Sequence, residues 1–162
     1  NNVHLDASEV VTWFWNVQEG NGCGMPYVEA ATIRIDDRAY IRRPHLWNPD
    51  FAFIYGAGAV NGFGHVGISV TIVGGGYYPW FVIGIDDDST PDPPGWPLWS
   101  VATSDSTPGN VWGDYCRIRS SHPSDVGFGA TGHVMVGGSA IPKYALFHRE
   151  RDNTSLTKYY RK

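Results

Sequence analysis

The sequence predicts an all-β protein, and three observations lead to that prediction. Short runs of β-branched and aromatic residues recur about every ten residues. Glycine, proline, asparagine and aspartate separate the runs, with 20 Gly and 11 Pro among 162 residues, as turns require. Apolar and polar residues alternate at 32–35 and 115–119, with the period of a half-buried strand. We therefore expect a single domain over residues 1–162, an antiparallel β-sandwich of jelly-roll type with about eight to ten short strands.

The expected strands follow the apolar runs along the chain. They cover residues 10–17, 28–35, 51–55, 65–73, 77–85, 98–103, 111–119, 133–136, 143–148 and 156–160. The segment 6–15 has two interpretations, because Asp6 and Glu9 have the spacing of a helix capping box. The β-branched and aromatic run that follows them favours a strand.

One hairpin stands out in this pattern. Gly74, Gly75 and Gly76 separate the runs 65–73 and 77–85, and glycine readily adopts the positive φ that tight hairpin turns need. Both runs are apolar almost throughout. We therefore expect this hairpin to lie centrally, with both faces covered.

Charge and hydropathy exclude two classes of protein. The net charge is −4, only 17% of residues are charged, and arginine and lysine form no long run. A nucleic-acid-binding protein usually has a basic face and a high isoelectric point, so we expect no nucleic-acid partner. No stretch reaches the roughly 20 apolar residues of a membrane helix, so we expect no membrane insertion.

The two cysteines, Cys23 and Cys116, are far apart in sequence, and they form either one disulfide or two buried thiols. The chain begins with Asn rather than Met, which is typical of a processed chain or a fragment. We expect an extracellular or particle-surface location. An oxidising compartment of that kind favours the Cys23–Cys116 disulfide.

An acidic segment follows the strand 77–85. Asp86, Asp88 and Asp92 stand at alternate positions with Thr90 between them, and calcium prefers six to eight oxygen ligands of this kind. Pro91 stands where an EF-hand loop needs glycine. The segment is therefore either a possible calcium site or a turn in which Asp and Ser side chains bind neighbouring amides.

Three tryptophans lie in loop-like segments. Trp96 and Trp99 follow the acidic segment, and Trp47 lies between two prolines, Pro44 and Pro49. Indole rings stack on the C–H faces of sugars, while carboxylates and amides bind sugar hydroxyls. The alternative is that each indole closes the end of the sandwich, since large aromatic residues usually bury most of their area.

A catalytic alternative comes from Cys23, His65 and Asp86, whose order is that of papain-like amidases. Residues 64–68, Gly-His-Val-Gly-Ile, resemble the histidine strand of CHAP and NlpC-type peptidases. The resemblance implies a Cys-His amidase-like hydrolase with Cys23 as the nucleophile. Glycines flank Cys23 and Pro26 follows, so the chain departs from the family pattern, in which the cysteine opens a helix.

Three functions remain. We expect a non-catalytic, lectin-like recognition module that binds a glycan or cell-surface receptor through aromatic and acidic loops. The first alternative is a structural subunit of a virus particle, phage fibre or surface filament. In that case the chain assembles with copies of itself into a trimer or larger homo-oligomer. The second is the hydrolase. No cofactor beyond the possible calcium is expected.

Overall fold

The computed structural model describes residues 9–20, 22–43, 45–87, 96–109 and 115–150, and these are nearly all β. They form eleven antiparallel strands in three sheets. The strands are β1 (Val10–Val17), β2 (Tyr27–Arg34), β3 (Tyr40–Arg42), β4 (His45–Leu46), β5 (Ala52–Val60), β6 (Val66–Gly74), β7 (Tyr77–Asp86), β8 (Leu98–Thr103), β9 (Arg117–Ser120), β10 (Phe128–Val136) and β11 (Ser139–Phe147).

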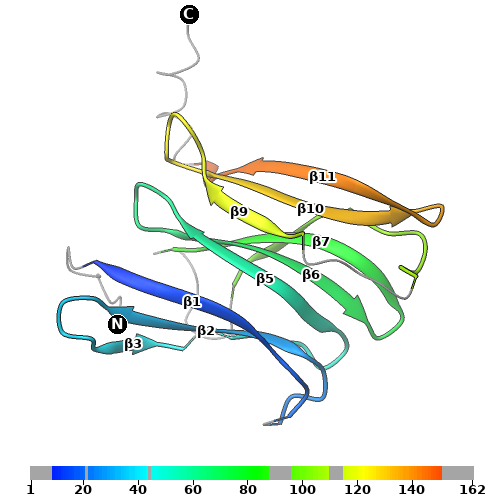
Figure 1. Cartoon of the computed structure of the whole chain (residues 1–162), viewed down its shortest axis with the longest axis horizontal. Helices are drawn as coiled ribbons and strands as arrows, with labels where there is room; N and C mark the ends of the chain where they lie inside the picture. Colours follow the sequence, from blue (N-terminus) through cyan, green and yellow to red (C-terminus); the bar gives the residue numbers. More distant parts are fainter. Residues whose placement is uncertain (1–8, 21, 44, 88–95, 110–114, 151–162) are drawn as a thin grey trace, which may run out of the picture.

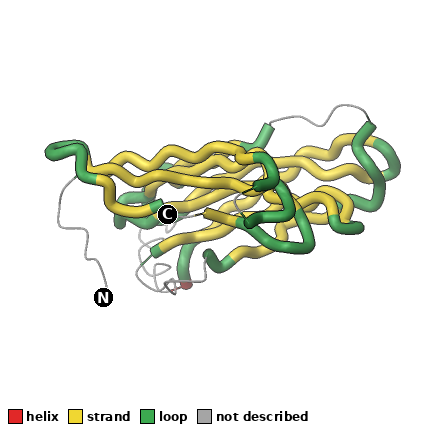
Figure 2. Tube along the Cα trace, turned by 90° about the horizontal axis from the view of Figure 1, so that it is seen from below, coloured by secondary structure: helices red, strands yellow, loops and turns green. Residues whose placement is uncertain are grey.

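The three sheets are stacked as layers (Figure 1). The lower sheet has the order β1-β2-β3, with β4 also paired to β2; the central sheet is β5-β6-β7-β8; the upper sheet is β11-β10-β9. Figure 2 shows the strands running lengthwise along the molecule, with turns joining them at their ends. Each sheet is therefore built from segments that are close in sequence.

The central sheet is covered on both faces, as the apolar runs of β6 and β7 predict. On one face, Ile68, Val70 and Val82 pack in a cluster with Val28 of the lower sheet. On the other face, Phe81 and Ile83 pack against Ala130 and Val134 of the upper sheet. Because successive side chains of a strand point to opposite faces, one hairpin supplies both hydrophobic cores. The expected central position of the hairpin is confirmed.

Glycine is needed where the upper sheet approaches the central one most closely. A Cβ atom at Gly132 of β10 would lie 2.5 Å from the ring of Phe81, and one at Gly67 of β6 would lie 2.6 Å from the ring of Phe128. Both rings are fully buried. The two phenylalanines therefore occupy the space that a larger residue at either glycine would need.

The antiparallel all-β fold is confirmed, and its details differ from expectation. The described residues contain eleven strands in three layers, more than the expected eight to ten, and a jelly-roll arrangement is not confirmed. The short strands β3 and β4 were not expected, because neither contains an apolar run. Residues 111–114 of the expected strand 111–119, and all of 156–160, lie outside the described residues.

The expected disulfide is wrong, because both cysteines are free thiols. Cys116 is buried before β9, with its Sγ 3.4 Å from Oγ1 of Thr71 on the central sheet. Cys23 lies in the loop that joins β1 and β2 in the lower sheet, where it forms an isolated bridge with Gly20. The two residues thus belong to different layers. Among the described residues, no helix has the length and apolar character needed to span a membrane.

Replacing Gly132 by Ala tests the close approach of the sheets. The added methyl group would press on the buried Phe81 ring, and overpacking of this kind costs about 1–3 kcal/mol of unfolding free energy. Urea denaturation of Gly132→Ala should show this loss. Gly24→Ala is the control, since no atom lies within 4 Å of a Cβ there; equal losses for both variants would contradict the packing argument.

Candidate functional site

The outer face of the lower sheet carries two exposed tryptophans. Trp13 and Trp15 of β1 are 53% and 39% exposed. Phe14, between them, points inward and packs against the core that the lower and central sheets share. Two residues along a strand span about 6.5 Å. The two indoles therefore lie side by side on one open surface.

Polar groups lie next to these indoles across the sheet. Trp15 pairs with Glu29 of β2, and Glu29 pairs in turn with His45 of β4, so the three residues form one row. At the other end of the sheet, Tyr40 of β3 pairs with Ile33 and is 58% exposed. We call Trp13, Trp15, Glu29, Tyr40, Arg43 and His45 the aromatic face.

A charged pair lies within the aromatic face. Oε1 of Glu29 is 2.5 Å from Nη2 of Arg43, and the side chains are 8% and 57% exposed, respectively. The carboxylate is therefore held in place beneath an accessible guanidinium. His45 is oriented by an edge-on contact with Tyr27, with ring centroids 6.3 Å apart. The face thus offers fixed hydrogen-bonding groups next to flat apolar rings.

The structure separates the three tryptophans nominated from the sequence. Trp47 directly follows Leu46 of β4 and is 42% exposed, so it adjoins the aromatic face. Trp96 instead packs edge-on against Phe14, with centroids 6.1 Å apart, as part of the core. Trp99 of β8 is 45% exposed, and the guanidinium of Arg149 lies 5.6 Å from its ring centroid. The three do not share one rim.

The acidic segment is only partly described. Asp86 is the last residue of β7, pairs with Val66 and is 6% exposed. Asp88 and Asp92 lie outside the described residues. Within the part of the chain that the structure describes, no group of three or more His, Cys, Asp or Glu residues could hold a metal ion. Calcium binding by this segment therefore stays a prediction.

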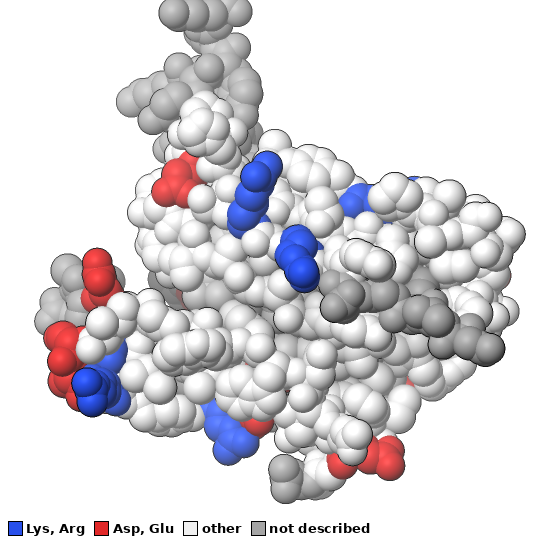
Figure 3. Space-filling model, in the orientation of Figure 1, with Lys and Arg blue, Asp and Glu red and all other residues white. Residues whose placement is uncertain are grey.

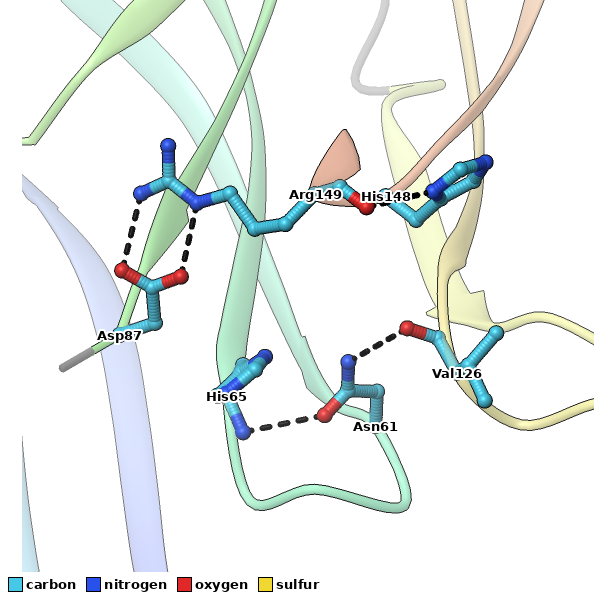
Figure 4. A network of polar contacts seen from close by, with 6 residues as sticks. All are labelled: Asn61, His65, Asp87, Val126, His148 and Arg149. Carbon is cyan, nitrogen blue, oxygen red and sulfur yellow. Dashed lines mark hydrogen bonds and ion pairs between the residues drawn. The ribbon is translucent and has the colours of Figure 1, made fainter. Parts of the chain in front are cut away.

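The neighbouring residue, Asp87, has a structural role that the sequence pattern did not reveal. Its carboxylate accepts two hydrogen bonds from Arg149, from Nε at 2.7 Å and from Nη2 at 2.9 Å, and its side chain is fully buried. Nearby, Asn61 donates to the carbonyl of Val126 and accepts from the N–H of His65 (Figure 4). These bonds join the end of β7, the β5–β6 turn and the segments that flank the upper sheet.

The structure does not bring the residues of the catalytic alternative together. His65 directly precedes β6, at the end where Val60 pairs with Val66. Cys23 is in the β1–β2 loop, whose Pro26 accepts a hydrogen bond from Phe53 near the opposite end of β6. A strand of nine residues is about 30 Å long. The two turns also lie at opposite ends of the molecule in Figure 1.

The aromatic face was not identified from the sequence, although the spacing of Trp13 and Trp15 was a signal for it. Tryptophans at positions 13 and 15 share one face of any strand, but the sequence does not say which face the next layer covers. No protein-family model, curated protein or solved structure matches this chain. Its function must therefore be inferred from the exposed side chains themselves.

The Asp87–Arg149 pair predicts a large effect on stability. Asp87→Ala leaves the Arg149 guanidinium without its carboxylate partner, and removing one member of a buried ion pair costs about 3–5 kcal/mol. Arg149 is 20% exposed, so water can partly replace the lost bonds and we expect a loss near 3 kcal/mol. The measurement is the free energy of unfolding in urea.

Asp37→Ala is the matched control, since Asp37 and Arg34 form an ion pair exposed to solvent. The side chains of Arg34 and Asp37 are 35% and 51% exposed, so water can replace the lost ion pair and the loss should be much smaller. Equal losses in the two variants would show that burial of the Asp87 carboxylate is unimportant.

Proposed function

We propose that this protein is a non-catalytic recognition module of extracellular or particle surfaces that binds carbohydrate through the aromatic face of its lower sheet. The observation that carries the proposal is the exposure of Trp13 and Trp15 on one face, beside the fixed Glu29–Arg43 pair. Grouped exposed aromatic residues in a soluble protein usually mark a binding surface. Glycans of cell-surface receptors are the expected partners.

The chemistry of the face suits a sugar in two ways. The C–H groups on one side of a pyranose ring form an apolar patch that packs on an indole, and burying an aromatic ring is among the larger contributions to binding. The hydroxyl groups of the sugar need partners once water has left. The exposed Arg43 guanidinium, held in place by the Glu29 carboxylate, donates such bonds, and charged partners make the stronger ones.

The open shape of the face favours an extended ligand. Trp13, Trp15 and Tyr40 lie on strands of one sheet rather than at the bottom of a cavity, so a chain of sugars can lie across them. Trp47 at the end of β4 extends the surface in one direction. Trp47 is therefore the one loop tryptophan, of the three expected to contact a ligand, that belongs to the proposed binding surface.

A second candidate function is that of a subunit in a particle or fibre. Its support is a second exposed apolar patch on β11 of the upper sheet, where Tyr144 and Leu146 are 62% and 55% exposed. Apolar surface on two opposite layers suits a chain that packs against copies of itself. Size-exclusion chromatography with light scattering tests this candidate: a trimer or larger ring supports it, and a monomer contradicts it.

A glycan array with purified wild-type protein, with and without calcium, tests the carbohydrate proposal. Trp13→Ala and Trp15→Ala should each weaken binding to the selected glycan at least about thirtyfold, because truncating a central aromatic contact costs at least about 2 kcal/mol. Isothermal titration calorimetry gives the affinities.

Tyr144→Ala is the control, because it removes an equally exposed aromatic ring from the opposite layer. Absence of binding to every glycan, or the same loss of affinity in Tyr144→Ala, would contradict the proposal. Binding that disappears only without calcium would place the ligand at the acidic segment instead.

A further inference from the structure

Three edge strands lie above one another along one side of the molecule. β1, β5 and β9 are edge strands of the lower, central and upper sheets, and β5 contacts both of the others (Figure 1). In the middle of this side, the register of β5 against β6 shifts between Ile54 and Ala57, which marks a bulge. The side chains near this bulge come from all three layers.

A hollow of about 150 Å³ lies at the bulge. Its lining residues are Asn16 from β1, Tyr55, Gly56 and Ala57 from β5, and Cys116 and Arg117 at the start of β9. An enclosed cavity of about 150 Å³ can hold a molecule the size of benzene, and this hollow has a similar volume but is partly open to solvent. The space thus suits a ring-sized group.

The bulge is held in an unusual backbone conformation. Tyr55 has a φ of 58°, which is uncommon for a residue with a side chain. Its N–H donates to Oδ1 of Asn16 at 2.9 Å, and a Cβ at Gly56 would lie 2.6 Å from the side chain of Val28. Backbone conformations of this kind cost free energy and concentrate at binding sites.

Two of the side chains that line the hollow, Asn16 and Arg117, carry N–H groups that can donate hydrogen bonds. Because Oδ1 of Asn16 accepts the Tyr55 N–H, the amide is oriented and its NH₂ group remains as a donor for a ligand. Arg117 donates from Nη1 to the carbonyl of Cys116 at 3.0 Å, which holds its guanidinium at the rim. The lining residues include no carboxylate. Such a site favours an anion.

Charge on this side agrees with that preference. Figure 3 shows basic side chains over the region of β9 and acidic ones towards the ends of the molecule. Burial raises the pKa of the Cys116 thiol, although Thr71, Ser69 and Arg117 act in the opposite direction. The thiol is therefore neutral at neutral pH and adds no negative charge to the hollow.

We propose that this hollow is a binding site for a small ligand with one carboxylate on a ring-sized body. The carboxylate accepts hydrogen bonds from Arg117 and from the NH₂ group of Asn16, and the ring fills the space next to Ala57 and Cys116. Asn16 directly follows Trp15 on β1, and successive side chains of a strand point to opposite faces. The site therefore lies on the side of β1 opposite to the aromatic face. It is thus independent of the proposed glycan binding.

The test is an NMR titration of the ¹⁵N-labelled full chain with sodium benzoate, benzamide and sodium sulfate. Benzoate should shift the amide signals of Tyr55 and Arg117 in a saturable way. Benzamide has the ring without the charge, and sulfate has the charge without the ring, so each should bind at least tenfold more weakly. Equal affinity for benzoate and either of these two probes, or no shift with benzoate, would overturn the proposal.

Two variants test the named groups. Arg117→Gln and Asn16→Asp should each weaken benzoate binding at least tenfold, and Asn16→Asp keeps the oxygen that accepts the Tyr55 N–H. Arg119→Gln, an exposed arginine two residues along β9, should bind as wild type. Unchanged binding in Asn16→Asp, or equal loss in Arg119→Gln, would overturn the site. Trp13→Ala should leave benzoate binding unchanged, which separates this site from the aromatic face.

Discussion

Burial of the central sheet on both faces is the constraint on which the other layers depend. β6 and β7 place Ile68, Val70 and Val82 towards one neighbour and Phe81 and Ile83 towards the other. Two hydrophobic cores therefore share one sheet, and each core fixes the position of an outer sheet. An outer sheet then has one covered face and one open face, as antiparallel sheets commonly do. Both proposed binding surfaces follow from that arrangement, since one is an open face and the other lies where the layers meet.

The sequence predicts the central hairpin well, because two continuous apolar strands joined by a glycine turn are expected to pair with each other and to be covered on both faces. It predicts the layers poorly. β3 and β4 contain three and two residues, and they are defined by pairing with β2 rather than by a pattern of their own. The number of layers depends on which faces of the sheets pack against each other. Such packing joins residues that are far apart in sequence, so local patterns do not predict it. The separation of Cys23 from Cys116 is unpredictable for the same reason.

In the candidate site too, local sequence patterns predict some features and long-range packing decides the others. The loop-like context of Trp47, Trp96 and Trp99 predicts either ligand contact or packing at the end of the sandwich. The structure places these three indoles in three environments: Trp47 next to the aromatic face, Trp96 in a core and Trp99 against Arg149. Which indole is exposed depends on what packs against it. The ion pair between Asp87 and Arg149 joins residues 62 positions apart, and no local sequence pattern predicts such a contact. Local alternation does place Trp13 and Trp15 on one face, and only the stacking of sheets reveals that the face is open.

The bulge in β5 also bears on how the protein avoids unwanted association. Within the described residues, β1, β5 and β9 each have one hydrogen-bonded neighbour in their sheets, so each has a side that no strand of its own sheet covers. Such sides invite strand addition from another chain, which leads to aggregation. At Tyr55 and Gly56 the regular spacing of the backbone N–H and C=O groups is broken, and the Tyr55 N–H is already bonded to Asn16. An incoming strand could not continue in register past this point. The irregularity that forms the hollow therefore also protects the longest of the three edges.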